Sequence, residues 1–138
     1  MKIKASILVV DDNEKLCDSL RDILEDDGYA VEIANNGKDA INMSQNSRFD
    51  IALIDCKLPD ISGAEVVNNL SSISPLIEFI HITAHATLDS AIDAVKQERV
   101  ISYELKPLDM DRLLSLLHQI VKRRKAEEEI QKLTQAIE

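Results

Sequence analysis

Several polar residues of this chain directly follow short apolar runs, and they comprise three acids that could bind a cation, one hydroxyl and one ammonium. Asp11 and Asp12 follow the first run, Asp55 ends another, and Thr83 and Lys106 follow two later ones. An all-oxygen set of ligands suits Mg²⁺, which keeps several of its waters in proteins. These residue types therefore predict a magnesium site, provided that the fold brings the three acids together.

The periodicity of apolar residues predicts the elements that position these side chains. Continuous or alternating apolar runs indicate five strands, at residues 6–10, 29–34, 50–54, 79–82 and 101–105. Between them, apolar residues recur at helical spacing, for instance at Leu16, Leu20 and Leu24, and Gly28 marks a helix end. We place Asn35-Asn36-Gly37 in a turn and residues 58–63 in a loop. Further helices are expected around Ala40, Ile41 and Met43; at 64–70; at Leu88, Ala91, Ile92 and Val95; and after Asp109, which can cap a long last helix.

Strands that alternate with helices predict an α/β fold with a parallel, doubly wound sheet and helices on both faces. Ligands of such sheets bind beyond the carboxyl ends of the strands. If the first and third strands are neighbours, three carboxylates meet at one edge. Two carboxylates about 4 Å apart repel by roughly 4 kcal/mol at an effective dielectric near 20, and a divalent ion removes this conflict. The alternative is that each acid merely caps the helix that follows it.

Four motifs together resemble the receiver domain of two-component response regulators. They are VVDD at 9–12, IDCKLPDISG at 54–63, ITA at 82–84 and YELKP at 103–107. The similarity spans roughly residues 5 to 121. It implies a flavodoxin-like sheet of five strands in the order 2-1-3-4-5.

The resemblance also implies a role for each matching residue. Asp55 would accept a phosphoryl group from a histidine kinase or phosphotransfer protein. Asp11, Asp12, Asp55 and the backbone carbonyl of Lys57 would hold Mg²⁺. Such a domain is a signalling module rather than an enzyme, catalysing only its own phosphorylation and slow dephosphorylation.

Three further positions of the resemblance concern the phosphorylated state. Lys106 and Thr83 would contact the phosphoryl oxygens, and the Lys106-Pro107 peptide bond is expected to be cis. As Thr83 turns towards the phosphate, Tyr103 would swing inward and change the surface formed by the fourth helix, fifth strand and fifth helix.

Two features leave details open. The chain has Arg99-Val100 before the fifth strand, where many receivers have Gly-Ala, so the resemblance does not predict the loop shape near the switch. Lys57 and His85 stand two residues after Asp55 and Thr83, where they could set the lifetime of the phosphate. For His85, an exposed loop imidazole is an equal alternative.

The C-terminal segment indicates a second part of the chain. We assign residues 1–121 to the receiver domain and residues 122–138 to a helical linker. Ala126, Ile130, Leu133 and Ile137 follow heptad spacing, which favours pairing with a second copy in a homodimer. Residues 133–138 resemble the lead-in to a PAS domain, so we expect a downstream output domain, such as a PAS domain or a kinase.

Composition excludes several other classes. The net charge is −9, and no basic stripe supports direct nucleic-acid binding. Two cysteines without CxxC spacing suggest neither a disulfide framework nor a zinc site. No apolar stretch approaches the roughly 18 residues of a membrane span, and no signal peptide is recognised. We therefore expect a cytoplasmic protein that does not bind a membrane.

Three alternative functions were weighed against the receiver interpretation. An aspartyl-phosphate phosphatase needs a second acid two residues after its nucleophile, where this chain has Lys57. A flavodoxin-like cofactor binder would need a phosphate-binding loop where Asp11 and Asp12 stand. A receiver-like interaction domain that takes no phosphate remains the main alternative.

Overall fold

The computed structural model describes residues 2–84, 97 and 99–137. It divides into two compact units, Met1–Pro107 and Leu108–Glu138. The helix predicted around Leu88, Ala91, Ile92 and Val95 lies outside the described residues, as does His85.

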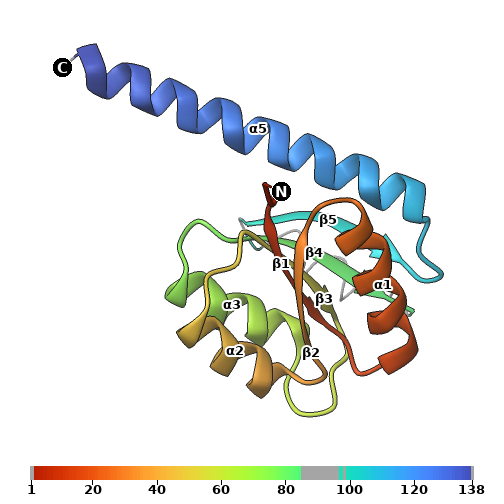
Figure 1. Cartoon of the computed structure of the whole chain (residues 1–138). Coiled ribbons are helices and arrows are strands. Elements are labelled where there is room, and N and C mark those ends of the chain that lie inside the picture. Colours follow the sequence, from red (N-terminus) through yellow and green to blue (C-terminus); the bar gives the residue numbers. More distant parts are fainter. Residues whose placement is uncertain (1, 85–96, 98, 138) are drawn as a thin grey trace. The chain divides into compact units, whose positions relative to one another are not determined.

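The first unit is built on a five-stranded sheet in the order β2-β1-β3-β4-β5. All four neighbouring pairs of strands are parallel, as Figure 1 shows. The predicted α/β fold and the strand order implied by the resemblance are therefore confirmed. The strands are β1 (Ser6–Val10), β2 (Ala30–Ala34), β3 (Ile51–Asp55), β4 (Glu78–Thr83) and β5 (Val100–Leu105).

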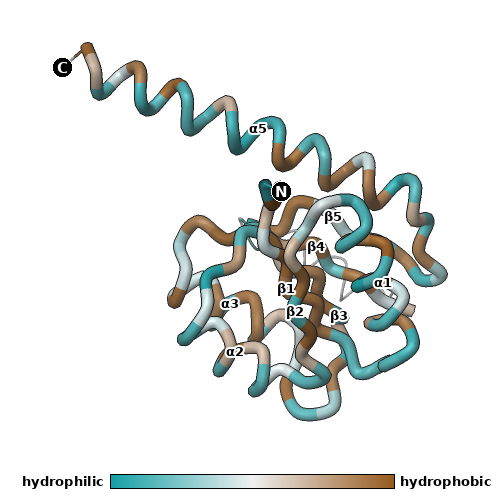
Figure 2. The backbone as a smooth tube through the Cα atoms, in the orientation of Figure 1, coloured by the Kyte–Doolittle hydropathy of each residue, from teal (hydrophilic) through white to brown (hydrophobic). Residues whose placement is uncertain are grey.

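Helices cover both faces of this sheet. In Figure 1, α1 (Glu14–Asp26) lies on one face, and α2 (Gly37–Asn46) and α3 (Gly63–Ile73) lie side by side on the other. Because side chains alternate along a strand, β1 can supply the core on both faces, and its residues Ile7 to Val10 are all fully buried. Figure 2 shows the central strands as the most continuously apolar part of the sheet.

Local hydrogen bonds explain where the helices begin and end. The side chains of Asn13, Asn36 and Ser62 each accept a hydrogen bond from the first turn of α1, α2 and α3. Gly28 has a positive φ of 95° just after α1, which confirms it as a helix end.

The positions predicted from the sequence for two glycines were wrong. Gly37 and Gly63 are the first residues of α2 and α3, whereas the sequence placed them in a turn and a loop. Glycine is a poor helix former in helix interiors, but these two directly follow a capping residue, where helical hydrogen bonds are only beginning. Thr83 is likewise the last residue of β4 rather than the residue beyond it.

The second unit contains one long helix, α5 (Met110–Ile137). Asp109 caps it as predicted, since its Oδ1 accepts a hydrogen bond from the backbone N–H of Arg112 at 3.1 Å. The predicted boundary between residues 121 and 122 falls within this continuous helix. Among the described residues, no helix is both long enough and apolar enough to cross a membrane.

Candidate metal centre

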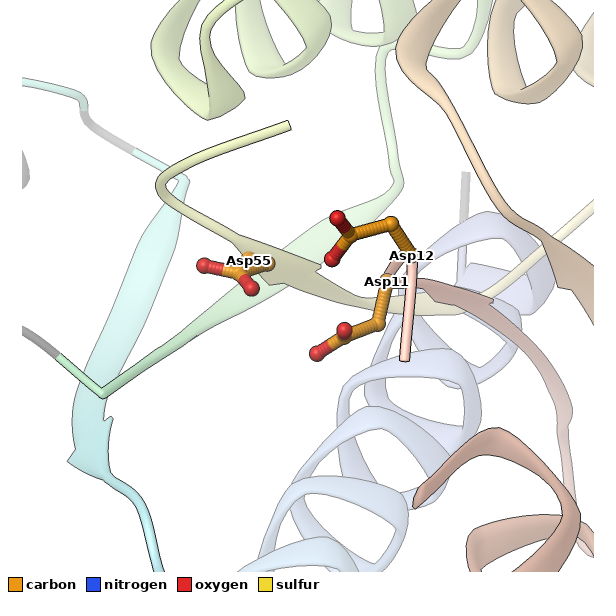
Figure 3. A group of neighbouring side chains, drawn as sticks. All are labelled: Asp11, Asp12 and Asp55. Atoms are coloured by element: carbon orange, nitrogen blue, oxygen red, sulfur yellow. The ribbon is translucent and has the colours of Figure 1, made fainter. Parts of the chain in front are cut away.

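Three carboxylates meet at the carboxyl edge of the sheet. Val10 and Ile54 are register partners in the paired strands β1 and β3, so Asp11 and Asp55 follow them side by side. Asp11, Asp12 and Asp55 each offer an oxygen within 4.8 Å of the others, as Figure 3 shows. Asp11 and Asp55 are buried while Asp12 is exposed. The convergence predicted from the strand ends is therefore present.

Lys106 brings a positive charge to two of these acids. Its Nζ lies 2.7 Å from Asp11 Oδ2 and 3.1 Å from Asp55 Oδ2. Burial opposes the charged form of Lys106, but the hydrogen bonds and charges of Asp11 and Asp55 outweigh it and raise the pKa of the ammonium. The backbone N–H of Lys106 donates to the carbonyl of Thr83 at 2.8 Å, so the edge of the sheet fixes its position. The Lys106-Pro107 peptide bond is cis.

Backbone amides hold the second oxygen of each buried acid. Asn13 donates its backbone N–H to Asp11 Oδ1 at 2.9 Å, and Lys57 donates its backbone N–H to Asp55 Oδ1 at 3.0 Å. Each carboxylate is thus held by an amide on one oxygen and by Lys106 on the other. The orientation of both groups is fixed by the protein itself.

The loop after Asp55 closes on itself. Lys57 and Ser62 form an antiparallel bridge, and the backbone N–H of Gly63 donates to the carbonyl of Cys56 at 3.1 Å. A Cβ atom on Gly63 would lie 2.5 Å from the carbonyl oxygen of Asp55. The start of α3 therefore packs directly against the end of β3.

Thr83 and Tyr103 lie on neighbouring strands. Thr83 is buried at the end of β4, and Tyr103 on β5 is half-buried and pairs in register with His81. The centroids of the Tyr103 and His81 rings lie 6.4 Å apart. The switch predicted for Thr83 and Tyr103 thus has its two residues on adjacent strands, although the helix predicted before β5 lies outside the described residues.

Cys56 adjoins Asp55 but is not suited to act as a nucleophile. Burial and the charge of Asp55 raise the pKa of its thiol to about 11, with the Tyr103 hydroxyl acting in the opposite direction. A thiol is reactive mainly as the thiolate, so Cys56 stays protonated near neutral pH. The carboxylate of Asp55 is the better candidate nucleophile at this edge.

The charges present fit a divalent cation. Three acidic side chains and one lysine carry a formal charge of about −2, which a divalent ion would neutralise. All the acid ligands are oxygens, as Mg²⁺ prefers.

Comparison with known proteins identifies the family. The model of the response regulator receiver domain matches residues 7–118. The chain belongs to this family. Members of the family bind Mg²⁺ at a cluster of aspartates, which here corresponds to the group of Asp11, Asp12 and Asp55. The family works with histidine kinases and output domains.

Individual receivers agree in sequence and in fold. A response regulator receiver protein of Anaeromyxobacter sp. (strain Fw109-5) is 39% identical over 109 residues, which cover 79% of this chain and 45% of that protein. The chain thus spans less than half the length of this relative. A receiver domain protein from Methanospirillum hungatei JF-1 has a TM-score of 0.85 and 30% identity, covering 91% of this chain and 99% of that one.

A second similar structure contains a phosphorylated residue. It is a response regulator protein from Burkholderia pseudomallei with a phosphorylated aspartic acid, a calcium ion and citrate. Its TM-score is 0.76 at 29% identity, covering 92% of this chain and 74% of that one.

Proposed function

We propose that this receiver takes a phosphoryl group onto Asp55 from a phosphohistidine of a histidine kinase or phosphotransfer protein. A carboxylate oxygen of Asp55 would attack the phosphorus, forming a P–O bond as the P–N bond breaks. The histidine nitrogen would leave with the electron pair and take up a proton from solvent. The observation that carries this proposal is the convergence of three acids within 4.8 Å, two of them in contact with Lys106.

Asp11, Asp12, Asp55 and the backbone carbonyl of Lys57 would hold Mg²⁺ in this reaction. When bound, the ion would neutralise negative charge on the phosphoryl oxygens. Lys106 is held against Asp55 at 3.1 Å and would move its ammonium onto the phosphoryl group. Thr83 would offer its hydroxyl to the same oxygens from the end of β4.

The signal would leave the site through Thr83 and Tyr103. A change in their side chains would alter the surface of β5 and, as the resemblance implies, that of the helices predicted before and after it. Phosphorylation acts on an existing equilibrium, and a shift from 1:99 to 99:1 requires about 5.5 kcal/mol of preference for one state. Their position on adjacent strands supports this route.

The wider role is that of a signalling module. We propose that the domain controls an attached or partner output domain in the cytoplasm, is not an enzyme beyond its own phosphorylation and slow dephosphorylation, and forms a homodimer through α5. The greater length of the Anaeromyxobacter relative supports an output beyond the receiver, and the phosphorylated aspartate of the Burkholderia protein supports the chemistry.

Intact mass spectrometry after incubation with Mg²⁺ and acetyl phosphate tests this function. The chain should gain one phosphoryl group, Asp55→Asn should gain none, and Cys56→Ser should gain it as the wild type does. A modification that survives Asp55→Asn would contradict the proposal. Full Mg²⁺ binding without any gain of mass would instead favour the receiver-like domain that takes no phosphate.

A further inference from the structure

Asp60 joins the loop after β3 to a helix far from it in sequence. Its Oδ1 accepts hydrogen bonds from the backbone N–H groups of Gly37 at 2.8 Å and Ile61 at 2.9 Å. Its Oδ2 accepts from the backbone N–H of Lys38 at 2.9 Å. Desolvation opposes the charge of Asp60, but these backbone hydrogen bonds outweigh it and lower the pKa of the carboxyl group. The carboxylate therefore binds the N-terminus of α2 as an anion.

This link is additional to the local cap of α2. The first N–H groups of a helix have no partner within the helix. Asn36 supplies the local cap, since its Oδ1 accepts from Asp39 N at 2.8 Å and its carbonyl accepts from Ala40 N at 3.3 Å. Asp60 takes the two remaining groups, which lie at the end of the helix and could otherwise bind water. Unlike the local cap Asn36, Asp60 therefore attaches the loop after β3 to the N-terminus of α2.

Beside this link, Gly37 of α2 packs closely against the side chains of Ile61 and Val66. A Cβ atom on Gly37 would lie 2.4 Å from Cγ1 of Ile61 and 2.8 Å from Cγ2 of Val66. Only glycine lets the loop approach the helix this closely. Ile61 is partly buried and packs against the core that Val66 belongs to.

The loop is therefore held at two places, at Lys57 beside Asp55 and at Asp60 on α2. At the first place, Lys57 donates to Asp55 Oδ1 and bridges to Ser62. At the second place, Asp60 is bound to α2. We infer that Asp60 is a positioning residue, which holds this loop on α2 so that the Lys57 carbonyl is in place for the cation. The inference rests on the proposed magnesium site and adds a residue to it that does not touch the ion.

Isothermal titration calorimetry of Mg²⁺ binding tests the inference, with two variants of one helix N-terminus. Asp60→Ala removes the link and should weaken Mg²⁺ binding about tenfold, which corresponds to about 1.4 kcal/mol. Asn36→Ala removes the local cap of the same helix without touching the loop. It should lower thermal stability to a similar extent yet keep the wild-type affinity for Mg²⁺.

Asp60→Asn provides a graded third variant. It keeps one oxygen that can accept from Gly37 and Ile61, and loses the acceptor for Lys38. Its affinity for Mg²⁺ should fall between those of the wild type and Asp60→Ala. If Asp60→Ala does not fold, Asp60→Asn alone tests the inference. The amide resonances of Gly37 and Lys38 should also move on addition of Mg²⁺ in the wild type and not in Asp60→Ala.

Two results would overturn the inference. One is wild-type Mg²⁺ affinity in both Asp60 variants. The other is an equal loss of affinity in Asn36→Ala, which would show that Asp60 acts only as a second cap of α2. Failure of the proposed function looks different. In that case the wild type itself would bind no Mg²⁺, or Asp55→Asn would bind it as well as the wild type.

Discussion

The Lys106 ammonium offsets part of the negative charge of the acid cluster. Repulsion between carboxylates implied from the sequence that a cation must join them, and Mg²⁺ was the cation expected. The structure shows that Lys106 already neutralises part of the charge, through contacts of 2.7 and 3.1 Å with Asp11 and Asp55. Together with the backbone amides on the opposite oxygens, this contact orients both acids before any ion binds. Such preorganisation reduces the cost of assembling a site.

His81 forms a second polar group beneath this edge, which the sequence did not indicate. Gln97 donates its amide to the carbonyl of Ala64 at 3.0 Å and to Asn68 Oδ1 at 3.1 Å. Its Oε1 therefore faces His81 Nε2, at 3.4 Å, as an acceptor. In a neutral imidazole, Nδ1 is then the acceptor for the Cys56 thiol, at 3.4 Å.

The neutral state of His81 predicts a dependence of stability on pH. Burial lowers its pKa, and Gln97, the Ile54 carbonyl and the charge of Asp55 oppose this only in part. The unfolded chain takes up a proton on His81 below about pH 6.5, whereas the folded chain does so only at lower pH. Stability should therefore be complete above that pH and fall as the pH decreases towards the folded pKa, by at most about 1.4 kcal/mol per pH unit.

Urea unfolding of His81→Gln at pH 7.5 and pH 5.0 measures this contribution. The loss of stability between the two pH values should be smaller in His81→Gln than in the wild type. His118→Gln removes an exposed imidazole instead and should retain the wild-type difference. An unchanged difference in His81→Gln would show that His81 is not the group responsible.

At the scale of the element, the start of α3 packs through Gly63 against the end of β3, which carries the proposed phosphorylation site. A Cβ atom there would meet the Asp55 carbonyl oxygen at 2.5 Å and the Cys56 Cα at 2.9 Å. Gly63→Ala must therefore displace the end of β3 or the start of α3. We expect a loss of about 1–3 kcal/mol in the free energy of unfolding, together with slower phosphorylation of Asp55.

Gly28→Ala is the matched control for that change. Gly28 has a φ of 95°, so alanine is strained there, but its Cβ would only make ordinary contact with Lys4. We expect a loss of roughly 1–2 kcal/mol with unchanged phosphorylation by acetyl phosphate. If both variants lose phosphorylation in proportion to stability, Gly63 has no specific connection to Asp55.

The elements also show what the sequence could and could not predict. Continuous or alternating apolar runs located all five strands, and the carboxyl ends of these strands predicted the meeting of Asp11, Asp12 and Asp55. The order of the strands came from the resemblance, because periodicity says nothing about which strands are neighbours. The partners of Asp60 were also beyond prediction, since Gly37 and Lys38 lie more than 20 residues away in sequence. From its place in the loop at residues 58–63, the sequence indicates only an ordinary turn residue at Asp60.

At the scale of the whole molecule, the far end of α5 exposes apolar side chains that the receiver does not need for its chemistry. The exposed fractions are 63% for Ile130, 66% for Leu133 and 87% for Ile137. These residues recur three and four positions apart, as in the seam of a coiled coil. A surface seam of this kind is costly to leave in water, so we expect it to pair with the same seam of a second copy.

Light scattering coupled to gel filtration tests this pairing in the full chain. The wild type should elute with the mass of two chains at high concentration, and the double variant Ile130→Lys, Leu133→Lys with the mass of one, because two ammonium groups would be forced into the seam. The double variant Gln131→Lys, Gln135→Lys adds the same charge outside the seam and should remain dimeric. Two heptads bind weakly, so the wild-type mass should fall on dilution. A wild type that stays monomeric at every concentration, or a dimer that survives both double variants, would mean that the apolar seam of α5 does not join two copies of this chain.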